Sequence, residues 1–364
     1  MLRTAAGRLA AAGWLPTSVR AVLGYYAHSG VVDVGSLRLK RRVDAVTEGM
    51  LEEAFAEVEA ALAAEFDRES VAFDYDTKLV LPAQLALGYC YRREAADREA
   101  RAEALTRLAI EALVDGDMRD ARNDAEYEDF AVDFPTDAED RARVARVAQE
   151  TLQARVEADF EAFDDEVRAL YDWAVEVSEA HQEQDEHFRD LMAAAEGAGT
   201  GAAADLDPAT ARERIREEYK FGTFEEDPEL FEPAELELPY LKTQYDRVGV
   251  IYDGMLGMYD AAGFEVDPAF VRSIVLAIIG AQIWLDDIDD YAADRRDGQL
   301  TPVTAEYLLA GDEAAARRAV LDISESYLDL ARAEATAADS PLTGIATEYI
   351  YRSGTPEVLP PGSP

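Results

Sequence analysis

Apolar side chains recur at three- and four-residue spacing along most of the chain, for example at Met50, Phe55, Val58 and Leu62. This spacing is typical of α-helices that bury one face. No run alternates apolar and polar residues between turn signals, so no β-strand is predicted. Helices are predicted over residues 36–65, 78–93, 97–112, 138–192, 208–219, 239–262, 268–293, 302–309 and 312–338. The pattern therefore predicts an all-α fold.

Stretches rich in glycine, proline and polar residues divide this pattern into parts. Residues 1–35 are predicted to form a helical appendage, and residues 36–350 one all-α domain. An acidic insertion is expected inside that domain, over about residues 125–218. The glycine and alanine stretch 197–204 is predicted to be a flexible surface connection, and residues 351–364 a disordered tail.

The chain carries 76 acidic and 35 basic residues among 364, a net charge of −41. Such a charge repels phosphate backbones and anionic lipids, which excludes a general nucleic-acid binder and argues against a membrane-surface protein. Excess acid with little lysine is typical of halophilic proteins, whose surface charges are screened in molar salt. A dedicated acidic interaction face is the alternative, but the acid is spread along the whole chain. The four lysines are Lys40, Lys78, Lys220 and Lys242.

The chain has one cysteine, Cys90, which excludes an internal disulfide and a cysteine-rich zinc site. No segment contains the roughly 18 consecutive apolar residues of a transmembrane helix, so no stable membrane span is predicted. Residues 1–16 lack the clean cleavage site of a signal peptide. A cytoplasmic protein is therefore expected.

The most apolar helix predicted for the chain runs directly into a cluster of aspartates. Residues 274–285 are almost entirely apolar, and four aspartates follow closely. On a helix, Asp286, Asp290 and Asp294 would share one face, with Asp287 beside it. Converging carboxylates repel one another unless a cation holds them, and Mg²⁺ takes oxygen ligands. The alternative is a solvated helix end in an acidic protein, which does not explain why the acids follow a helix that must be buried.

The letters "DDIDDYAAD" in this cluster resemble the second aspartate-rich motif, DDxxDyxxD, of trans-isoprenyl diphosphate synthases. Gln282 and the isoleucine after it resemble that family's Gln-Ile pair, one residue further from the acids than usual. Downstream, Gly298, Thr301 and Pro302 resemble the family's Gly-Lys-x-Thr-Leu-Pro segment, with Gln299 in place of the lysine. The chain is on this basis similar to the class I isoprenoid synthases over roughly four fifths of its length.

Two lysines match further landmarks of this family. Lys242 and Thr243 match its Lys-Thr pair, which implies that the Lys242 ammonium contacts an allylic diphosphate. Lys78 stands at the lysine of the family's Gly-Lys-Arg-x-Arg-Pro motif, but Leu79 and Leu81 replace both arginines. Those arginines help to hold isopentenyl diphosphate in the family, so the use of that co-substrate stays open. The alternative for Lys242 is an ordinary surface lysine.

The stretch "EALVDGDMRDARND" lies where the family carries its first aspartate-rich motif. Asp117 and Asp120 fit the second and last acids of a short variant of that motif, but Gly116 stands where the first aspartate is usual. Asp120 and Asp124 would share a helix face, in the DxxxD form of squalene and phytoene synthases. The similarity implies metal binding by these three acids, with diphosphate contacts from two arginines; a solvated acidic helix end is the alternative. The two arginines are Arg119 and Arg122.

The resemblance implies an isoprenoid synthase-like helical bundle around a central cavity. The implied activity is the Mg²⁺-dependent ionisation and transfer of a prenyl diphosphate, as in a prenyltransferase of isoprenoid biosynthesis. The implied partners are this small-molecule substrate and a second copy of the chain in a homodimer. The implied catalytic residues are Asp286, Asp287, Asp290 and Lys242, the substrate-binding residues Lys78, Arg119, Arg122, Lys242 and Gln282, and the metal ligands Asp117, Asp120, Asp124, Asp286, Asp287, Asp290 and Asp294.

Other functions stay open at this point. A terpene cyclase or a squalene/phytoene-type condensing enzyme would need no isopentenyl diphosphate site. A non-catalytic homologous subunit would keep the fold with a decayed first metal site, which Gly116 favours. An unrelated acidic helical protein would carry the motif through composition alone. His181 and His187 are predicted to lie on an exposed acidic helix rather than in a metal site.

Overall fold

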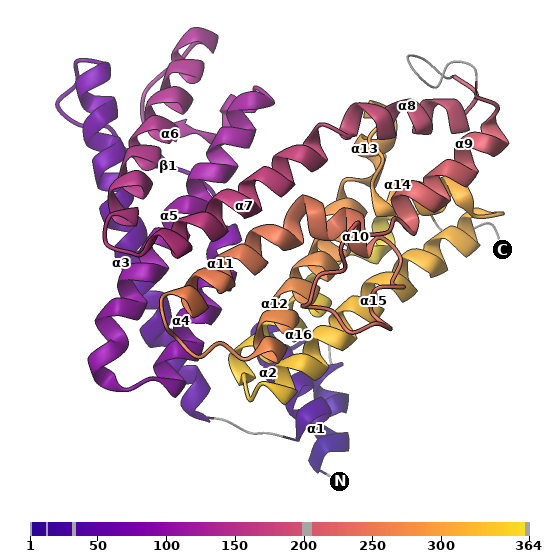
Figure 1. The fold of residues 1–364 in the computed structure, drawn as a ribbon, viewed down its shortest axis with the longest axis horizontal. Helices are drawn as coiled ribbons and strands as arrows, with labels where there is room; N and C mark the ends of the chain where they lie inside the picture. The colour runs from indigo at the N-terminus through magenta and orange to yellow at the C-terminus, as the bar shows by residue number, and fades with distance from the viewer. Residues whose placement is uncertain (1, 12–13, 31–33, 199–205, 361–364) are drawn as a thin grey trace. The chain divides into compact units, whose positions relative to one another are not determined.

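The computed structural model describes residues 2–11, 14–30, 34–198 and 206–360. Over these ranges the protein is built of helices, together with one small two-stranded sheet (Figure 1). The prediction of an all-α fold is therefore confirmed. The chain divides into two compact units. Two of the four boundaries between them fall within helices, α7 (Asp165–Gln182) and α11 (Val250–Ala261), and the other two lie at residues 33/34 and 265/266.

Unit 2 comprises residues 34–171 and 255–265. In it, α5 packs against α4 and α6, and α3 packs against the same three helices. Val58 and Leu62 of α3 are fully buried, as the apolar spacing predicts. Besides parts of α7 and α11, the elements are α3 (Val34–Glu65), β1 (Phe73–Asp74), η1 (Lys78–Val80), α4 (Leu81–Arg93), η2 (Ala96–Arg98), α5 (Glu99–Asn123), η3 (Tyr127–Asp129), β2 (Ala131–Val132) and α6 (Ala138–Phe160). The strands pair antiparallel, with Phe73 opposite Val132.

Unit 1 comprises residues 1–33, 172–254 and 266–364. Three of its segments are π-helical, a rare conformation that is often found at functional sites. Besides parts of α7 and α11, the elements are α1 (Leu2–Ala10), α2 (Thr17–Ser29), α8 (Asp185–Ala195), α9 (Pro208–Arg214), the π-helix η5 (Ile215–Lys220), α10 (Leu241–Gln244), the π-helix η6 (Tyr245–Gly249), α12 (Pro268–Ala281), the π-helix η7 (Gln282–Asp287), α13 (Tyr291–Asp297), α14 (Pro302–Leu309), α15 (Glu313–Ala337), α16 (Pro341–Ser353) and η8 (Pro356–Val358).

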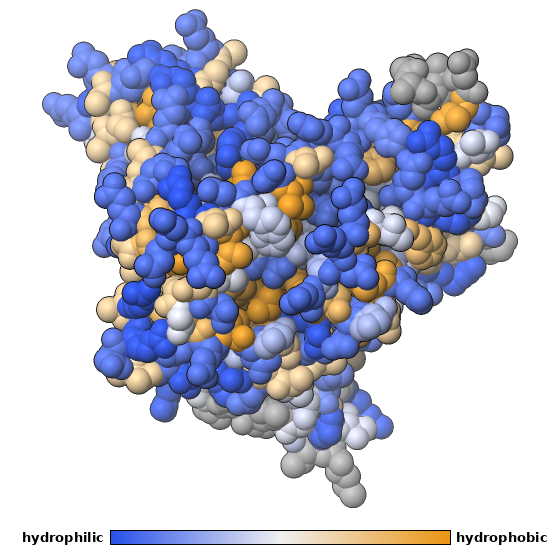
Figure 2. Space-filling view, in the orientation of Figure 1, coloured by the Kyte–Doolittle hydropathy of each residue, from blue (hydrophilic) through white to orange (hydrophobic). Residues whose placement is uncertain are grey.

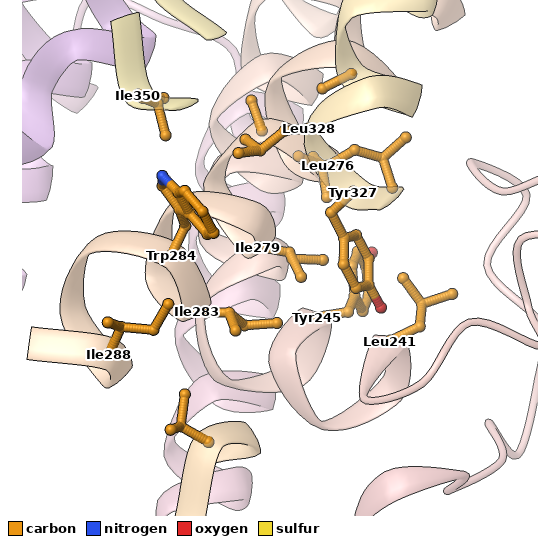
Figure 3. Packing of buried hydrophobic residues seen from close by; sticks show 14 of the residues in the cluster. Leu241, Tyr245, Leu276, Ile279, Ile283, Trp284, Ile288, Tyr327, Leu328 and Ile350 are labelled. Atoms are coloured by element: carbon orange, nitrogen blue, oxygen red, sulfur yellow. The ribbon is translucent and has the colours of Figure 1, made fainter. Parts of the chain in front are cut away.

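The core of unit 1 is built around α12. Asp267 caps this helix by accepting a hydrogen bond from the backbone N–H of Ala269, and a proline occupies its first turn. Its apolar side chains pack against α15, and Ile279 lies close to Ile283 of η7 in the resulting cluster (Figure 3). At Gly280, an added Cβ would lie 2.9 Å from Leu328 Cδ2. The two helices therefore approach closely where α12 carries its glycine.

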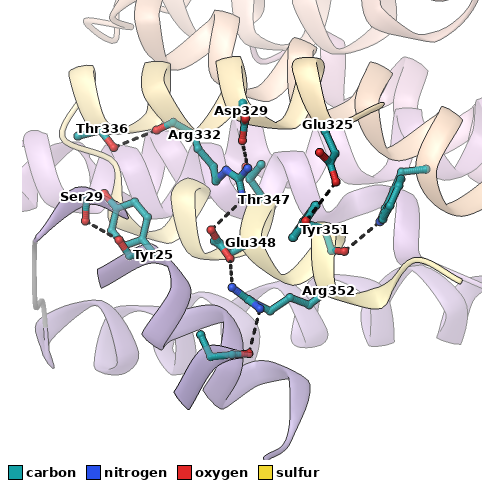
Figure 4. Close-up of polar contacts among 12 residues, drawn as sticks. Tyr25, Ser29, Glu325, Asp329, Arg332, Thr336, Thr347, Glu348, Tyr351 and Arg352 are labelled. Atoms are coloured by element: carbon teal, nitrogen blue, oxygen red, sulfur yellow. Dashed lines mark hydrogen bonds and ion pairs between the residues drawn. The ribbon is translucent and has the colours of Figure 1, made fainter. Parts of the chain in front are cut away.

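The C-terminal helix α16 packs against α15 and α2, and buried charges link it to α15 and to the end of α1 (Figure 4). Arg332 donates a hydrogen bond to Glu348 at 2.8 Å, and Glu348 also pairs with Arg352 at 2.8 Å. Arg352 in turn donates to the carbonyl oxygen of Ala10 at 3.0 Å. There is no room for a side chain at Gly24, where a Cβ would overlap the carboxylate of Glu348. The short helices in residues 1–35 thus dock on α16 through a polar network.

Several predicted elements differ from the observed ones. The single helix predicted over residues 138–192 is three helices, α6, α7 and α8, because the chain turns near Phe163 and again near Glu183. The helix predicted to end at residue 112 continues as α5 to Asn123, since Gly116 is accommodated within it. The predicted connection 197–204 lies largely outside the described residues, which stop at residue 198 and resume at 206.

The predicted disordered tail, residues 351–364, is wrong for its first part. Tyr351 belongs to α16 and stacks on Trp284, with 5.7 Å between ring centroids. The indole of Trp284 also donates a hydrogen bond to the Tyr351 carbonyl oxygen at 3.0 Å. Leu359 is 1 % exposed, so burial holds the segment after α16 on unit 1. Residues 361–364 lie outside the described residues.

The described residues include one helical stretch, Pro268–Asp287, that is long and apolar enough to cross a membrane. Over half of its most apolar window is buried inside the protein, as in the core helix of a soluble protein. The prediction of no stable membrane span is compatible with this burial. On the face drawn in Figure 2, hydrophilic residues cover most of the surface, in keeping with the acidic composition.

Candidate functional site

The aspartate cluster begins where α12 passes into the π-helix η7. The backbone N–H of Asp290 donates to the Asp286 carbonyl oxygen at 2.9 Å, and that of Asp294 donates to the Asp290 carbonyl oxygen at 2.9 Å. These bonds place the three aspartates on successive turns, although Asp290 itself lies outside both helices as the N-cap of α13. Asp286 and Asp290 are exposed, whereas Asp294 is half-buried. The arrangement presents a row of carboxylates at the end of a buried helix.

Asp287 differs from its neighbours because its side chain is only 2 % exposed. Its Oδ1 receives a long hydrogen bond of 3.5 Å from Gln282 Nε2, and its Oδ2 has no hydrogen-bond partner among the described residues. Burial raises the pKa of Asp287 to about 7, and Arg247 offsets part of that rise. Successive residues of a helix point in directions roughly 100° apart around its axis, so Asp287 faces inward while Asp286 faces outward.

The acids of this row destabilise one another's charged forms. Desolvation and the nearby charges of Asp286 and Asp289 raise the pKa of Asp290. Desolvation and Asp290 raise the pKa of Asp294 to about 6, with a smaller opposite effect from Arg247. Gln282 donates a short hydrogen bond to Asp286, so it orients that carboxylate. A bound cation would relieve this repulsion.

Two cations lie in the same unit, on α10 and η6. Lys242 pairs with Asp246 one turn later, at 2.7 Å, and its side chain is 22 % exposed. Thr243 is buried, and its hydroxyl donates to the carbonyl oxygens of Tyr219 and Tyr240, each at 3.2 Å. Thr243 therefore anchors α10, which leaves Lys242 as the polar group of this pair that reaches solvent. Arg247, which the sequence did not single out, lies five residues after Lys242 in η6.

His181 is buried, not exposed as the sequence predicts. It is 3 % exposed, and its Nδ1 has no partner among the described residues. Burial, together with the smaller effects of the charges of Arg247 and Lys242, lowers the pKa of His181 to about 4. The prediction failed because this end of α7 packs inward, with the His181 ring beside Phe188. His187 instead bonds to Glu218 at 2.8 Å.

The first aspartate-rich stretch lies on α5 in unit 2. Asp117 accepts a hydrogen bond of 2.7 Å from the Tyr75 hydroxyl. Desolvation raises the pKa of Asp117, and Asp120 adds to that rise, although the side chain still reaches solvent. Asp120 and Asp124 are exposed, and the N–H of Asp124 donates to the Asp120 carbonyl oxygen at 3.0 Å. These two acids therefore lie one helical turn apart, as a DxxxD spacing requires.

The arginines beside this stretch bond within unit 2. Arg122 donates a short hydrogen bond to Gln149, which in turn donates to Asp115 at 2.8 Å. Arg119 lies 3.9 Å from the same carboxylate. Asp115 is 2 % exposed, so these contacts serve a buried acid that the sequence does not distinguish from its neighbours.

The remaining lysines differ widely in their surroundings. Lys78 is 90 % exposed and pairs with Asp76 at 2.6 Å, and Lys40 pairs with Asp44 at 2.7 Å with a side chain 57 % exposed. Lys220 is 17 % exposed and pairs with the buried Glu306 at 2.6 Å. Lys220 is therefore a structural cation of unit 1.

The structure thus gathers the predicted site residues into two sets. Unit 1 holds Lys242, Gln282, Asp286, Asp287, Asp290 and Asp294, and unit 2 holds Lys78, Asp117, Arg119, Asp120, Arg122 and Asp124. Among the described residues, no group of three or more His, Cys, Asp or Glu side chains has the arrangement of a metal site. Comparisons with protein-family models, curated protein sequences and solved structures gave no significant match, so the resemblance is carried by the motifs alone.

Proposed function

We propose that the protein is a Mg²⁺-dependent enzyme that ionises a prenyl diphosphate and transfers the prenyl group. The observation that carries the proposal is the row Asp286, Asp290 and Asp294, whose carboxylates follow the buried helix α12 on successive turns. An acidic protein has no need to place mutually repelling carboxylates at the end of its most apolar helix. A site that must hold a divalent cation gives a reason to do so.

The residues suit Mg²⁺ in chemistry, because carboxylate oxygens are its preferred protein ligands. Asp286 and Asp290 are exposed enough to bind it directly or through water, and Asp294 completes the row. Bound Mg²⁺ would supply positive charge to the departing pyrophosphate. Lys242 would donate hydrogen bonds to its oxygens, after giving up or sharing its bond to Asp246. Gln282 would keep Asp286 oriented.

The resemblance extends the proposal to unit 2, where Asp117, Asp120 and Asp124 would form the second acidic set. The exposure of Asp120 and Asp124 and their one-turn spacing support this role. Arg119 and Arg122 would reach a diphosphate only if they released their present contacts. Lys78 is exposed but lacks the two arginines that accompany it in the family. A cyclase or condensing activity, which needs no isopentenyl diphosphate, therefore remains within the proposal.

A non-catalytic homologous subunit is a second candidate, and two observations favour it. Gly116 occupies the place of the first acid in its motif, and no metal site is formed among the side chains of the described residues. Such a subunit would bind a prenyl diphosphate without releasing pyrophosphate. Turnover therefore distinguishes the two candidates.

The test is pyrophosphate release from farnesyl or geranylgeranyl diphosphate with Mg²⁺ at molar KCl, with and without isopentenyl diphosphate. We expect release that stops on chelation and falls at least about a hundredfold in Asp286→Asn. Asp297→Asn is the matched control, since it removes an exposed acid of α13 outside the row and should leave the rate unchanged. Folded wild-type protein that binds the substrate but never releases pyrophosphate would favour the subunit.

A further inference from the structure

Residues 1–32 differ in charge from the rest of the chain. They contain no aspartate or glutamate, although the chain carries 76 acidic side chains among 364 residues. They do contain three arginines, Arg3, Arg8 and Arg20. The net charge of the whole chain, which argues against a membrane-surface protein, averages over this difference. The first stretch of the chain is therefore locally basic in an otherwise acidic protein.

The helices α1 and α2 of this stretch form an antiparallel hairpin in unit 1. Arg3 Nε donates a hydrogen bond to the carbonyl oxygen of Ala27 at 3.1 Å, and Arg20 Nε donates to that of Ala10 at 3.0 Å. The start of α1 thus lies beside the end of α2, and the end of α1 lies beside the start of α2. An added Cβ at Gly7 would lie 3.6 Å from the Ala27 Cβ, so the two helices pack closely.

The hairpin buries small residues and exposes its large apolar ones. Ala10 and Ala21 are 1 % and 0 % exposed, whereas Leu9, Trp14 and Val19 are 45 %, 77 % and 43 % exposed. The three exposed side chains belong to the last turn of α1, the connection after it and the first turn of α2, which together form the hairpin tip. Burial of apolar area stabilises in proportion to that area, so a water-facing hairpin has reason to cover tryptophan before alanine. The tip therefore presents apolar surface that the fold leaves in contact with solvent.

Contacts with α16 hold the hairpin on the body of unit 1. Arg352 donates a hydrogen bond of 3.0 Å to the carbonyl oxygen of Ala10, which also accepts the bond from Arg20. Gly24 of α2 lies directly against the carboxylate of Glu348. The end of α1 next to the hairpin tip is thus anchored on α16.

The side chains of the hairpin tip match the chemistry of a bilayer surface with anionic headgroups. Tryptophan is enriched where headgroups meet acyl chains, and apolar side chains beside it can enter that boundary to a depth of about 5–10 Å. Arg8, which is exposed and precedes Leu9, would meet the anionic headgroups. The absence of acidic residues from 1–32 removes the local repulsion that such a surface would otherwise exert.

A second copy of the chain is a less suitable partner for the hairpin tip. A stable protein interface takes about 20–30 residues from each side, whereas the tip offers three large apolar side chains. A bilayer requires only that a few side chains enter it. The net charge of −41 does not prevent this contact at molar salt, because a Debye length of about 3 Å screens the more distant acids of the chain.

We propose that the hairpin tip docks the protein on a bilayer with anionic headgroups. Leu9, Trp14 and Val19 enter the boundary between headgroups and acyl chains, and Arg8 lies among the headgroups. The contact is peripheral, since it involves a tip of short helices and no membrane-spanning segment. The inference goes beyond the proposed function and does not depend on it.

The test is flotation of the full chain at molar KCl with vesicles of phosphatidylglycerol and phosphatidylcholine, and in parallel with vesicles of phosphatidylcholine alone. We expect the protein to bind the mixed vesicles. Trp14→Ala should weaken that partitioning at least about tenfold, because it removes the largest inserted apolar side chain. Trp173→Ala is the matched control, since the Trp173 indole is 39 % exposed on α7 outside the hairpin tip, and it should partition like the wild type. Arg8→Gln should weaken binding to the mixed vesicles only.

A wild-type protein that binds neither kind of vesicle would overturn the inference, and so would a Trp14→Ala variant that binds as tightly as the wild type. Light scattering examines the other partner: a wild-type dimer that Trp14→Ala converts to a monomer, with no vesicle binding by either, would assign the hairpin tip to a second copy. Because Trp14 is exposed, its replacement should leave the circular dichroism unchanged, which separates lost docking from lost folding. Pyrophosphate release takes no part in this test, so its failure leaves the proposed function untouched.

Discussion

His181 is held in its neutral form by its surroundings. Burial, together with the smaller effects of two nearby cations, lowers the pKa of His181 to about 4, against an ordinary value of 6.5. The unfolded chain therefore binds a proton more readily than the folded chain below about pH 6.5. The contribution of neutral His181 to the free energy of unfolding is therefore fully present above that pH, and it is lost as the pH falls toward 4.

We predict that replacing His181 by glutamine makes the protein less sensitive to acid. The pKa of about 4 in the folded protein, against 6.5 ordinarily, predicts how much stability the wild type loses in acid. Its free energy of unfolding should fall by up to about 3 kcal/mol between pH 7 and pH 4. The measurement is the free energy of unfolding by urea at a series of pH values. His28→Gln, which replaces an exposed histidine, is the control. Parallel pH profiles for wild type and His181→Gln would contradict the prediction.

At the residue scale, the candidate acids stand out in the sequence more clearly than the candidate cations. The aspartates after α12 stand out because an apolar helix precedes them, and Lys242 stands out because lysine is scarce. Arg247 is one of many arginines, and nothing in its neighbours along the chain sets it apart. Asp287 and Asp286 are equivalent in the sequence, yet one is buried and the other exposed. Helical spacing places Asp287 beside the face of Asp286, but it does not say which of the two faces is covered by the rest of the fold.

The close packing of α12 on α15 makes Gly280 sensitive to substitution. A methyl group there would lie 3.1 Å from both Leu328 Cγ and Tyr327 Cβ, and Tyr327 Cβ cannot move without its helix. Overpacking costs about 1–3 kcal/mol, whereas alanine in a helix gains about 1 kcal/mol over glycine. We predict that Gly280→Ala lowers the free energy of unfolding by up to about 2 kcal/mol, measured by chemical denaturation.

Gly49 in α3 supplies the contrast, since an added Cβ there meets nothing within 4 Å. Gly49→Ala should therefore stabilise the protein by up to about 1 kcal/mol through helix propensity alone. Equal effects of the two substitutions would show that α12 and α15 are not packed as described.

At the scale of elements, long helices with regular apolar spacing are predicted well. The observed α3, α14 and α15 begin and end within two residues of the predicted ranges. The predicted helix over 138–192 fails because the breaks at Phe163 and Glu183 carry no glycine or proline signal. The helix α16 escapes prediction because its buried face is largely small or polar, with Thr343, Gly344 and Thr347 packed inward. Packing rather than local spacing decides these cases.

At the scale of the whole molecule, the net charge of −41 makes stability depend on salt. The Debye length falls from about 10 Å at 0.1 M salt to about 3 Å at 1 M, so added salt screens repulsion between surface acids. We predict that the melting temperature rises steeply from low to molar KCl. Relief of about 3 kcal/mol would raise the melting temperature of a unit of this size by about 6–12 °C.

Differential scanning calorimetry across a KCl series checks this prediction. Sucrose at matched osmolality is the control, because it strengthens burial without screening charge. A melting temperature that responds equally to sucrose and KCl, or to neither, would mean that charge repulsion does not limit the stability of this chain.

The unit boundaries inside α7 and α11 were not predicted from the sequence. The three segments of unit 1 alternate along the chain with the two segments of unit 2, and two of the four boundaries fall inside α7 and α11, where helical spacing continues without a break. A linker rich in glycine or proline would have signalled a boundary, and none is present at these positions. Contacts between distant segments define the units, and such contacts leave no local trace in one sequence.

The unequal exposure of the lysines has a practical consequence. Amine-reactive fluorophores would couple at Lys40 and Lys78, whose side chains are 57 % and 90 % exposed, and only slowly at Lys220 and Lys242, at 17 % and 22 %. Both reactive lysines belong to unit 2. Apart from the α-amino group, a brief dye reaction would thus mark one unit selectively and spare Lys242, which gives a spectroscopic reporter built into the natural chain.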